Sequence, residues 1–112
     1  MSKRLERASS FLHQEVSRIL PTFIHDKRLG LLTVSKVDLA ADLGRALVWI
    51  SVLGNEFPLE TVESLLNKQA KGLQTTIAKS LAWKRTPKIS FRIDHSGDYA
   101  QHIEQVLSGL EG

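Results

Sequence analysis

Alternation of apolar and polar residues in two separate segments is the feature that most constrains the fold of this chain. In residues 45–53, and again in residues 88–94, every second side chain is apolar. The apolar positions are Ala46, Val48, Ile50 and Val52, then Ile89, Phe91 and Ile93. Because successive side chains of a strand point to opposite faces, each segment predicts a strand with one buried face. A sheet built from them needs a second layer over that face.

A third segment, residues 31–39, is strand-like but changes phase midway. Leu32 and Val34 share one parity, whereas Val37 has the other. One extra residue near position 35 would return all the apolar side chains to one face, so a β-bulge is expected there. The connection to the next strand is short and contains turn residues, which predicts an antiparallel hairpin.

The first helical pattern runs from Lys3 to about Ile24. Its apolar residues recur at steps of three and four, which places them on one helical face. Pro21 interrupts the pattern near its end. Proline has no backbone N–H and disfavours helical geometry in the preceding residue, so we expect a kink or an early end there.

The second helical pattern begins at Pro58, which suits the first turn of a helix. Its apolar seam passes straight through Ala70-Lys71-Gly72. A glycine inside a helix costs about 1 kcal/mol relative to alanine. We therefore expect two short helices here, with a bend at Ala70 and Gly72.

A last helix is expected after Ser96, which gives the order helix, strand, strand, helix, bend, helix, strand, helix. This order predicts a two-layer α+β domain in which helices cover one face of a three-stranded sheet. The length of 112 residues fits one domain, residues 1–112. No apolar run is long enough to span a membrane. The chain has no cysteine, which excludes disulfides and thiolate chemistry and favours a cytoplasmic location.

Positive charge is concentrated in one part of the chain. The first 63 residues hold eight basic and eight acidic residues, whereas residues 65–93 hold seven basic residues and no acidic one. Exposed helices usually mix both signs, so this stretch predicts contact with RNA phosphates, although a solvated surface is the alternative. Its candidate RNA-binding residues are Lys68, Lys71, Lys79, Lys84, Arg85, Lys88 and Arg92.

A second group of candidates lies outside that stretch. Arg4, Arg7 and Arg18 share one side of the first helix, and Arg45 starts the second strand. Trp49 falls on the outer face of that strand, where it could stack on a base or simply cover apolar surface.

Several stretches occur in the order typical of a type II KH-like domain. Together they resemble the ribosome-binding factor A family of bacterial small-subunit maturation factors, over about residues 4–110. The stretches are residues 26–30, 34–37, 42–54, 70–72, 87–91 and 94–96. The chain departs from the family pattern at Pro21 and at Lys27, where a proline is common.

The resemblance implies that the protein is not an enzyme and needs no cofactor. It implies binding to the immature small ribosomal subunit and its ribosomal RNA, help in late maturation and precursor RNA end processing, and a role in the cold. A GTPase or another assembly factor is a further candidate partner, and we expect a monomer. Ala70-Lys71-Gly72 stands where other KH domains carry a Gly-x-x-Gly loop that clamps nucleotides. With one glycine, we expect recognition of charge and shape rather than of base sequence.

Two other classes of function compete with RNA binding. Asp94-His95-Ser96 contains the letters of a hydrolase triad, but adjacent residues at a strand end point apart and cannot form the relay. His95, Asp98 and His102 make only a weak metal-site pattern. A protein-interaction module that docks through the first helix or a sheet edge remains open. The acid-free stretch favours RNA, because protein docking gives no reason for it.

Overall fold

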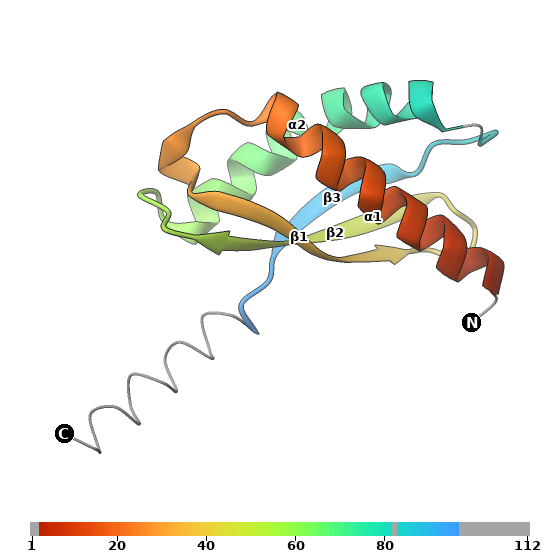
Figure 1. The fold of residues 1–112 in the computed structure, drawn as a ribbon, viewed down its shortest axis with the longest axis horizontal. Helices are drawn as coiled ribbons and strands as arrows, with labels where there is room; N and C mark the ends of the chain where they lie inside the picture. The colour runs from red at the N-terminus through yellow and green to blue at the C-terminus, as the bar shows by residue number, and fades with distance from the viewer. Residues whose placement is uncertain (1–2, 82, 97–112) are drawn as a thin grey trace, which may run out of the picture.

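The computed structural model describes residues 3–81 and 83–96. In this part of the chain, helices pack against a three-stranded sheet, which confirms the α+β class. Figure 1 shows the arrangement. The elements are α1 (Lys3–Phe23), a 3₁₀ turn η1 (Lys27–Leu29), β1 (Leu31–Leu39), β2 (Arg45–Leu53), α2 (Leu59–Ser80) and β3 (Lys88–Ile93). The helix expected after Ser96 lies outside the described residues.

The sheet has the strand order β1-β2-β3, with β2 in the centre. β1 and β2 form the expected antiparallel hairpin, and β3 pairs with β2 in parallel. A parallel pair needs a long crossover, which α2 provides. The register shifts between Val34 and Lys36, so the β-bulge expected near residue 35 is confirmed. Val34 and Val37 both point into the core as a result.

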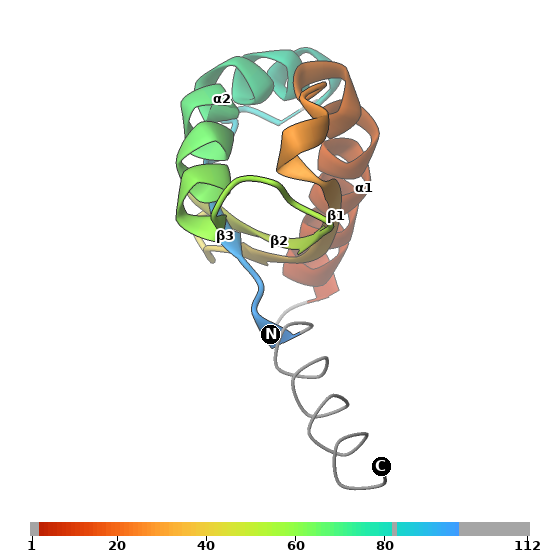
Figure 2. The same ribbon diagram turned by 90° about the vertical axis from the view of Figure 1, so that its left-hand side faces the viewer.

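The core lies between the sheet and the two helices. Figure 2 views the molecule from one end and shows α1 and α2 on the same side of the sheet. In β3 the burial pattern alternates strictly, with Ile89, Phe91 and Ile93 buried and their neighbours exposed. Ala46, Val48 and Ile50 are buried in the same way on β2. The two alternating segments therefore bury one face each in the same core, as predicted.

Pro21 lies inside α1 and does not end it early. The helix continues through Phe23, and the N–H of Ile24 still donates to the carbonyl of Leu20 at 3.1 Å. The missing N–H of proline removes only one helical hydrogen bond, and in the last turn few bonds remain to be lost. The Thr22 hydroxyl also donates to the Ile19 carbonyl at 2.6 Å, which helps to hold this turn.

α2 is one helix of 22 residues, so the expected division into two short helices is wrong. The ribbon nevertheless turns in both views, where its colour passes from green to teal (Figures 1 and 2). Glycine keeps its N–H and carbonyl, so it can bend a helix without interrupting its hydrogen bonds. The hydroxyls of Thr75 and Thr76 donate to the carbonyls of Lys71 and Gly72, a contact that often bends helices.

Gly72 also allows the end of α1 to approach α2 closely. A Cβ atom at this position would lie 3.2 Å from Cε1 of Phe23. This distance is too short for comfortable packing, so a side chain here would push the Phe23 ring away. Ala70, its neighbour in the predicted bend, is buried. Both bend residues therefore serve helix packing.

Candidate nucleic-acid interface

All eleven candidate RNA-binding residues are exposed. They lie on α1 (Arg4, Arg7, Arg18), on β2 (Arg45), on α2 (Lys68, Lys71, Lys79), in the connection between α2 and β3 (Lys84, Arg85) and on β3 (Lys88, Arg92). Within the described residues, Arg18 alone among them forms a salt bridge, to Glu15 at 2.7 Å. The other ten cations are therefore free of carboxylate partners in the described part of the chain.

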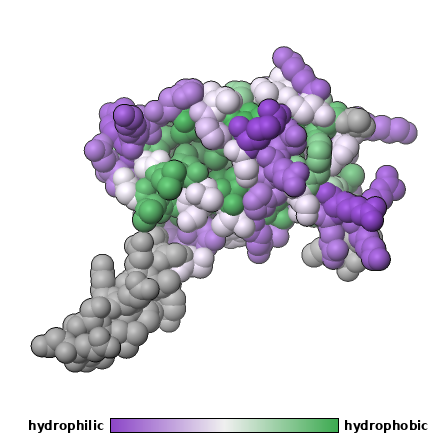
Figure 3. Space-filling model, in the orientation of Figure 1, coloured by the Kyte–Doolittle hydropathy of each residue, from purple (hydrophilic) through white to green (hydrophobic). Residues whose placement is uncertain are grey.

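Two of these groups meet in space although they are far apart in the sequence. Arg4 and Arg7 from the first turns of α1 line the same groove as Lys84 and Arg85. The loop between β1 and β2 closes the groove on a third side, and its volume is about 810 Å³. Figure 3 shows hydrophilic side chains gathered at this end of the molecule, over the start of α1. The groove therefore concentrates four positive charges.

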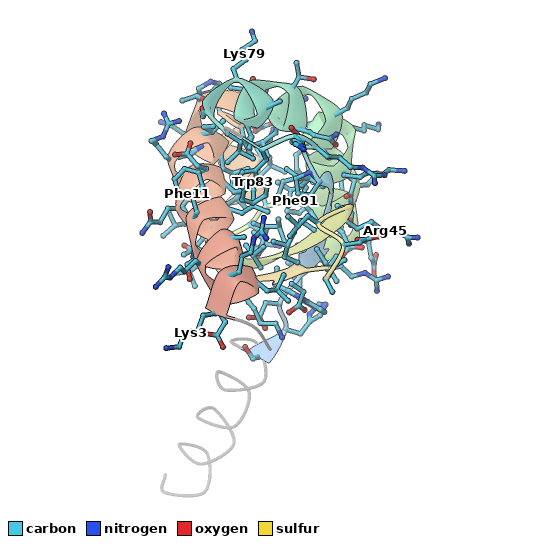
Figure 4. The ribbon with its side chains drawn as sticks, turned by 90° about the vertical axis from the view of Figure 1, so that its right-hand side faces the viewer. Lys3, Phe11, Arg45, Lys79, Trp83 and Phe91 are labelled. Carbon is cyan, nitrogen blue, oxygen red and sulfur yellow. The ribbon has the colours of Figure 1, made fainter. Side chains whose placement is uncertain are left out.

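Two aromatic side chains line the same groove. Phe11 is 41% exposed, and Trp83 is half-buried against the core. Figure 4 looks onto this end, with Phe11 on α1 and Trp83 beside it. Aromatic faces bordered by Arg and Lys are the arrangement that single-stranded nucleic-acid sites use. We name this surface the aromatic-basic groove (Arg4, Arg7, Phe11, Trp83, Lys84, Arg85).

The sequence interpretation missed both aromatic residues. A signal for Phe11 was available, because positions 4, 7 and 11 are spaced by three and four residues and so share one side of a helix. Phe11 therefore interrupts the arginine side of α1 with an apolar ring that does not belong to the core stripe. Trp83 directly precedes Lys84 and Arg85. No spacing rule links these two segments to each other.

One acidic residue, Asp42, also lines the groove. Its Oδ1 accepts a hydrogen bond from the N–H of Gly44 at 2.9 Å, which closes the tight turn between β1 and β2. The carboxylate therefore has a structural role in the loop. Four cations against one anion leave the groove with a net positive charge.

The outer face of the sheet carries a second set of cations, but here the signs are mixed. Arg45 lies opposite Lys88 in the register, and Trp49 lies opposite Arg92. Trp49 Nε1 donates to Asp38 Oδ2 at 3.0 Å, and Lys36 Nζ lies 5.8 Å from the centre of its ring. These neighbours hold the indole in place, so this face is less suited to stacking on a base than the groove is.

Lys68, Lys71 and Lys79 lie on α2 and are not among the residues that line the groove. The helix is continuous through Lys71 and Gly72, and the N–H groups of a helix interior donate to its own carbonyls. The bend therefore offers no free backbone donors to a phosphate. It can contribute the charge of its lysines and nothing resembling a Gly-x-x-Gly clamp.

The free edge of β3 is closed by side chains of α2. The N–H of Ile89 donates to Gln74 Oε1 at 3.3 Å, that of Phe91 to Asn67 Oδ1 at 2.8 Å, and that of Ile93 to Glu63 Oε2 at 3.1 Å. A strand needs free N–H and carbonyl groups to pair with another chain. Protein docking by strand addition at this edge is therefore disfavoured.

None of the helices among residues 3–81 and 83–96 combines the length and apolarity that crossing a membrane requires. The same residues contain no group of three or more His, Cys, Asp or Glu side chains that could hold a metal ion. Asp98 and His102, two members of the weak metal pattern, lie outside the described residues.

The fold and the groove together define a KH-like α+β domain that presents a basic surface with aromatic side chains. Residues 4–107 match the family model described as ribosome-binding factor A, and the chain belongs to that family. A relative from Trichlorobacter lovleyi, ribosome-binding factor A, is 32% identical over 105 residues, which cover 94% of this chain and 85% of the relative.

Structural neighbours share this fold. The solution NMR structure of a Thermotoga maritima putative ribosome-binding factor A has a TM-score of 0.70 and 28% identity, over 82% of this chain and 88% of that one. A homology model of the Thermus thermophilus factor, fitted into a cryo-EM map of a 30S complex, has a TM-score of 0.68 and 22% identity, over 79% of this chain and 92% of that one. The expected KH-like fold is thereby confirmed.

Proposed function

We propose that this protein binds the immature small ribosomal subunit by contacting its ribosomal RNA, and that it assists late maturation and precursor RNA end processing without catalysing a reaction. Membership of the ribosome-binding factor A family supports this role. The 30S complex of the Thermus thermophilus relative supports the partner. The observation on this chain that carries the proposal is the convergence of Arg4, Arg7, Lys84 and Arg85 on one groove.

Phosphate contact is the simplest use of these cations. Each phosphate that a protein neutralises releases counterions. For each such contact, a tenfold rise in salt lowers the logarithm of the binding constant by about 0.7 to 0.9. If the four cations of the groove each engage one phosphate, a rise from 50 to 200 mM salt should weaken binding by about 100-fold. Such contacts position a protein on a folded RNA and carry no base sequence information.

Binding alone can account for an effect on RNA processing. A protein that prefers the immature conformation of the subunit shifts the population toward it until the RNA ends have been trimmed by other enzymes. Under this proposal the protein acts in the cytoplasm, where the subunit matures. An assembly factor such as a GTPase would remove it by favouring the mature conformation, for which the protein has lower affinity.

The test is sedimentation of the purified protein with small subunits from maturation-deficient cells and with mature subunits, at stepped salt. The proposal predicts more protein with the immature particles and a loss of binding as salt rises. Equal binding to both particles, unaffected by salt, would contradict it. The variant Lys27→Glu controls for the effect of a charge reversal outside the groove, because Lys27 is exposed and is not among the residues that line it. It should bind like the wild type.

A further inference from the structure

We propose that the aromatic-basic groove is a subsite for one unpaired nucleotide of RNA. The inference rests on the proposed function and adds to it a specific place and a specific RNA element. In this arrangement the base lies against Phe11 and Trp83, and its flanking phosphates meet the cations at the rim. The two aromatic residues come from α1 and from the connection before β3, and both line the groove.

The exposure of Phe11 beside two arginines of the same groove is the first observation in favour of a ligand. Phe11 is 41% exposed, whereas the core positions of the same helix, such as Leu12 and Val16, are fully buried. Removing an apolar ring from water is favourable, so a ligand that covers Phe11 would gain this free energy. Phe11 lies on the same side of α1 as Arg4 and Arg7, so a ligand that covers the ring also meets both guanidinium groups.

The second observation is the chemical composition of the groove. A volume of about 810 Å³ falls in the range of small-ligand sites. Cations and aromatic side chains that line one groove match a nucleotide, whose flat base stacks on an aromatic face while its phosphates carry negative charge. An acidic peptide would satisfy the four cations but would not need the aromatic rings.

An unpaired nucleotide fits this groove better than a duplex does. Bases within an RNA helix are stacked and paired, and side chains cannot reach into its deep, narrow major groove. The paired and stacked bases of a duplex offer no free face on which Phe11 or Trp83 could stack. Unstacked bases in loops, bulges and strand ends can enter a groove and stack on aromatic side chains. The ligand class is therefore single-stranded RNA.

Trp83 provides a direct readout, because the chain has only two tryptophans. Trp49 lies on the outer face of the sheet, so the variant Trp49→Phe leaves Trp83 as the sole indole signal. Adding a single-stranded RNA of about eight nucleotides should quench the Trp83 fluorescence in a saturable way. The same sequence as a duplex should quench it far less. Phe11→Ala in this background should weaken the single-strand affinity by about ten-fold.

Matched variants separate charge at the groove from charge elsewhere. Arg7→Glu should greatly weaken quenching, whereas Lys27→Glu, with the same change of charge at an exposed position outside the groove, should not. Circular dichroism checks that each variant is folded. Equal quenching by duplex and single strand, or an unchanged affinity of Phe11→Ala, would overturn the subsite. So would quenching by peptides of small-subunit proteins in place of RNA.

The Trp49→Phe variant distinguishes two outcomes: that the subsite proposal is wrong, and that the proposed function is wrong. If Trp49→Phe sediments with immature subunits in a salt-sensitive way but single-stranded RNA leaves Trp83 unquenched, the subsite is wrong and the function stands. If the protein neither sediments with immature subunits nor responds to RNA, both proposals fail.

Discussion

Asn67 of α2 pairs with both backbone polar groups of Phe91 in β3. Its Nδ2 donates to the Phe91 carbonyl at 3.0 Å, and its Oδ1 accepts from the Phe91 N–H at 2.8 Å. An asparagine amide offers a donor and an acceptor side by side, so it can replace a neighbouring strand at this position. The crossover helix thus closes the edge of the sheet that it packs against, and this edge is unavailable for pairing with another chain.

Replacing Asn67 by leucine should lower the free energy of unfolding by about 2 kcal/mol. The variant loses both hydrogen bonds to Phe91 and leaves the N–H of this buried residue without its acceptor. Urea unfolding of the wild type and the variant measures the difference. Gln69→Leu, at an exposed position of the same helix, is the control and should change stability by less than about 0.5 kcal/mol. Equal effects of the two changes would show that the edge contact adds nothing.

Gly72→Val should destabilise the protein by about 2 kcal/mol, because even its Cβ would lie 3.2 Å from Phe23 Cε1. Thermal unfolding should show a lower midpoint. The cause can be tested by repeating the change in a Phe23→Ala background, where the obstructing ring is absent. There Gly72→Val should cost little, since valine is a better helix former than glycine. An identical loss in both backgrounds would rule out the contact with Phe23.

The hydrogen bonds of Ser96 lower the pKa of Asp94 to about 2, from an ordinary value of 3.8. The Ser96 hydroxyl and N–H donate to Asp94 Oδ1 at 2.7 and 3.0 Å and favour the charged form. Since folding lowers this pKa, the stabilisation is present above pH 3.8 and is lost as the pH falls through about 2.

Ser96→Ala should therefore raise the pKa of Asp94 toward its ordinary value and make the loss of stability between pH 4 and pH 2 shallower. A carboxyl-carbon NMR titration measures the pKa, and urea unfolding across this range measures the stability. Ser80→Ala, at an exposed helix end, should change neither quantity. A pKa of Asp94 that does not respond to Ser96→Ala would show that the hydroxyl contributes nothing.

The structure divides the basic residues into sets that mutagenesis can rank. The pair Lys84→Glu and Arg85→Glu changes the groove, whereas Lys71→Glu and Lys79→Glu makes the same change of charge on α2. We expect the first pair to weaken sedimentation with immature subunits more strongly and to reduce the salt slope by about two contacts. The reverse ranking would place the main RNA contact on α2. Circular dichroism should show both variants folded.

The sequence was sufficient to predict which faces are buried, since parity and helical spacing depend only on neighbouring residues. The shift in parity between Val34 and Val37 therefore predicted the bulge that the register shows. The division of α2 into two short helices at Gly72 was wrong, because propensity alone does not reveal that Phe23 packs against this glycine. Tertiary contact accounts for a glycine inside an unbroken helix.

The candidate site was predictable only in part, because it joins segments about eighty residues apart in the sequence. The type and spacing of the candidate cations predicted that they would be exposed. The structure shows that all of them are. The placement of Arg7 and Arg85 in one groove depends on how α1 packs relative to the connection before β3, which no local pattern encodes. Phe11 became informative only when its exposure was known.

Crosslinking on the native particle shows which side chains of the protein touch RNA. Ultraviolet irradiation of the protein bound to immature small subunits, followed by sequencing of the RNA and mass spectrometry of the peptides, identifies both partners of each contact. We predict crosslinks between unpaired nucleotides of the small-subunit ribosomal RNA and peptides that contain Phe11 or Trp83. Crosslinks confined to ribosomal proteins, or to RNA with peptides from the outer sheet face alone, would contradict it.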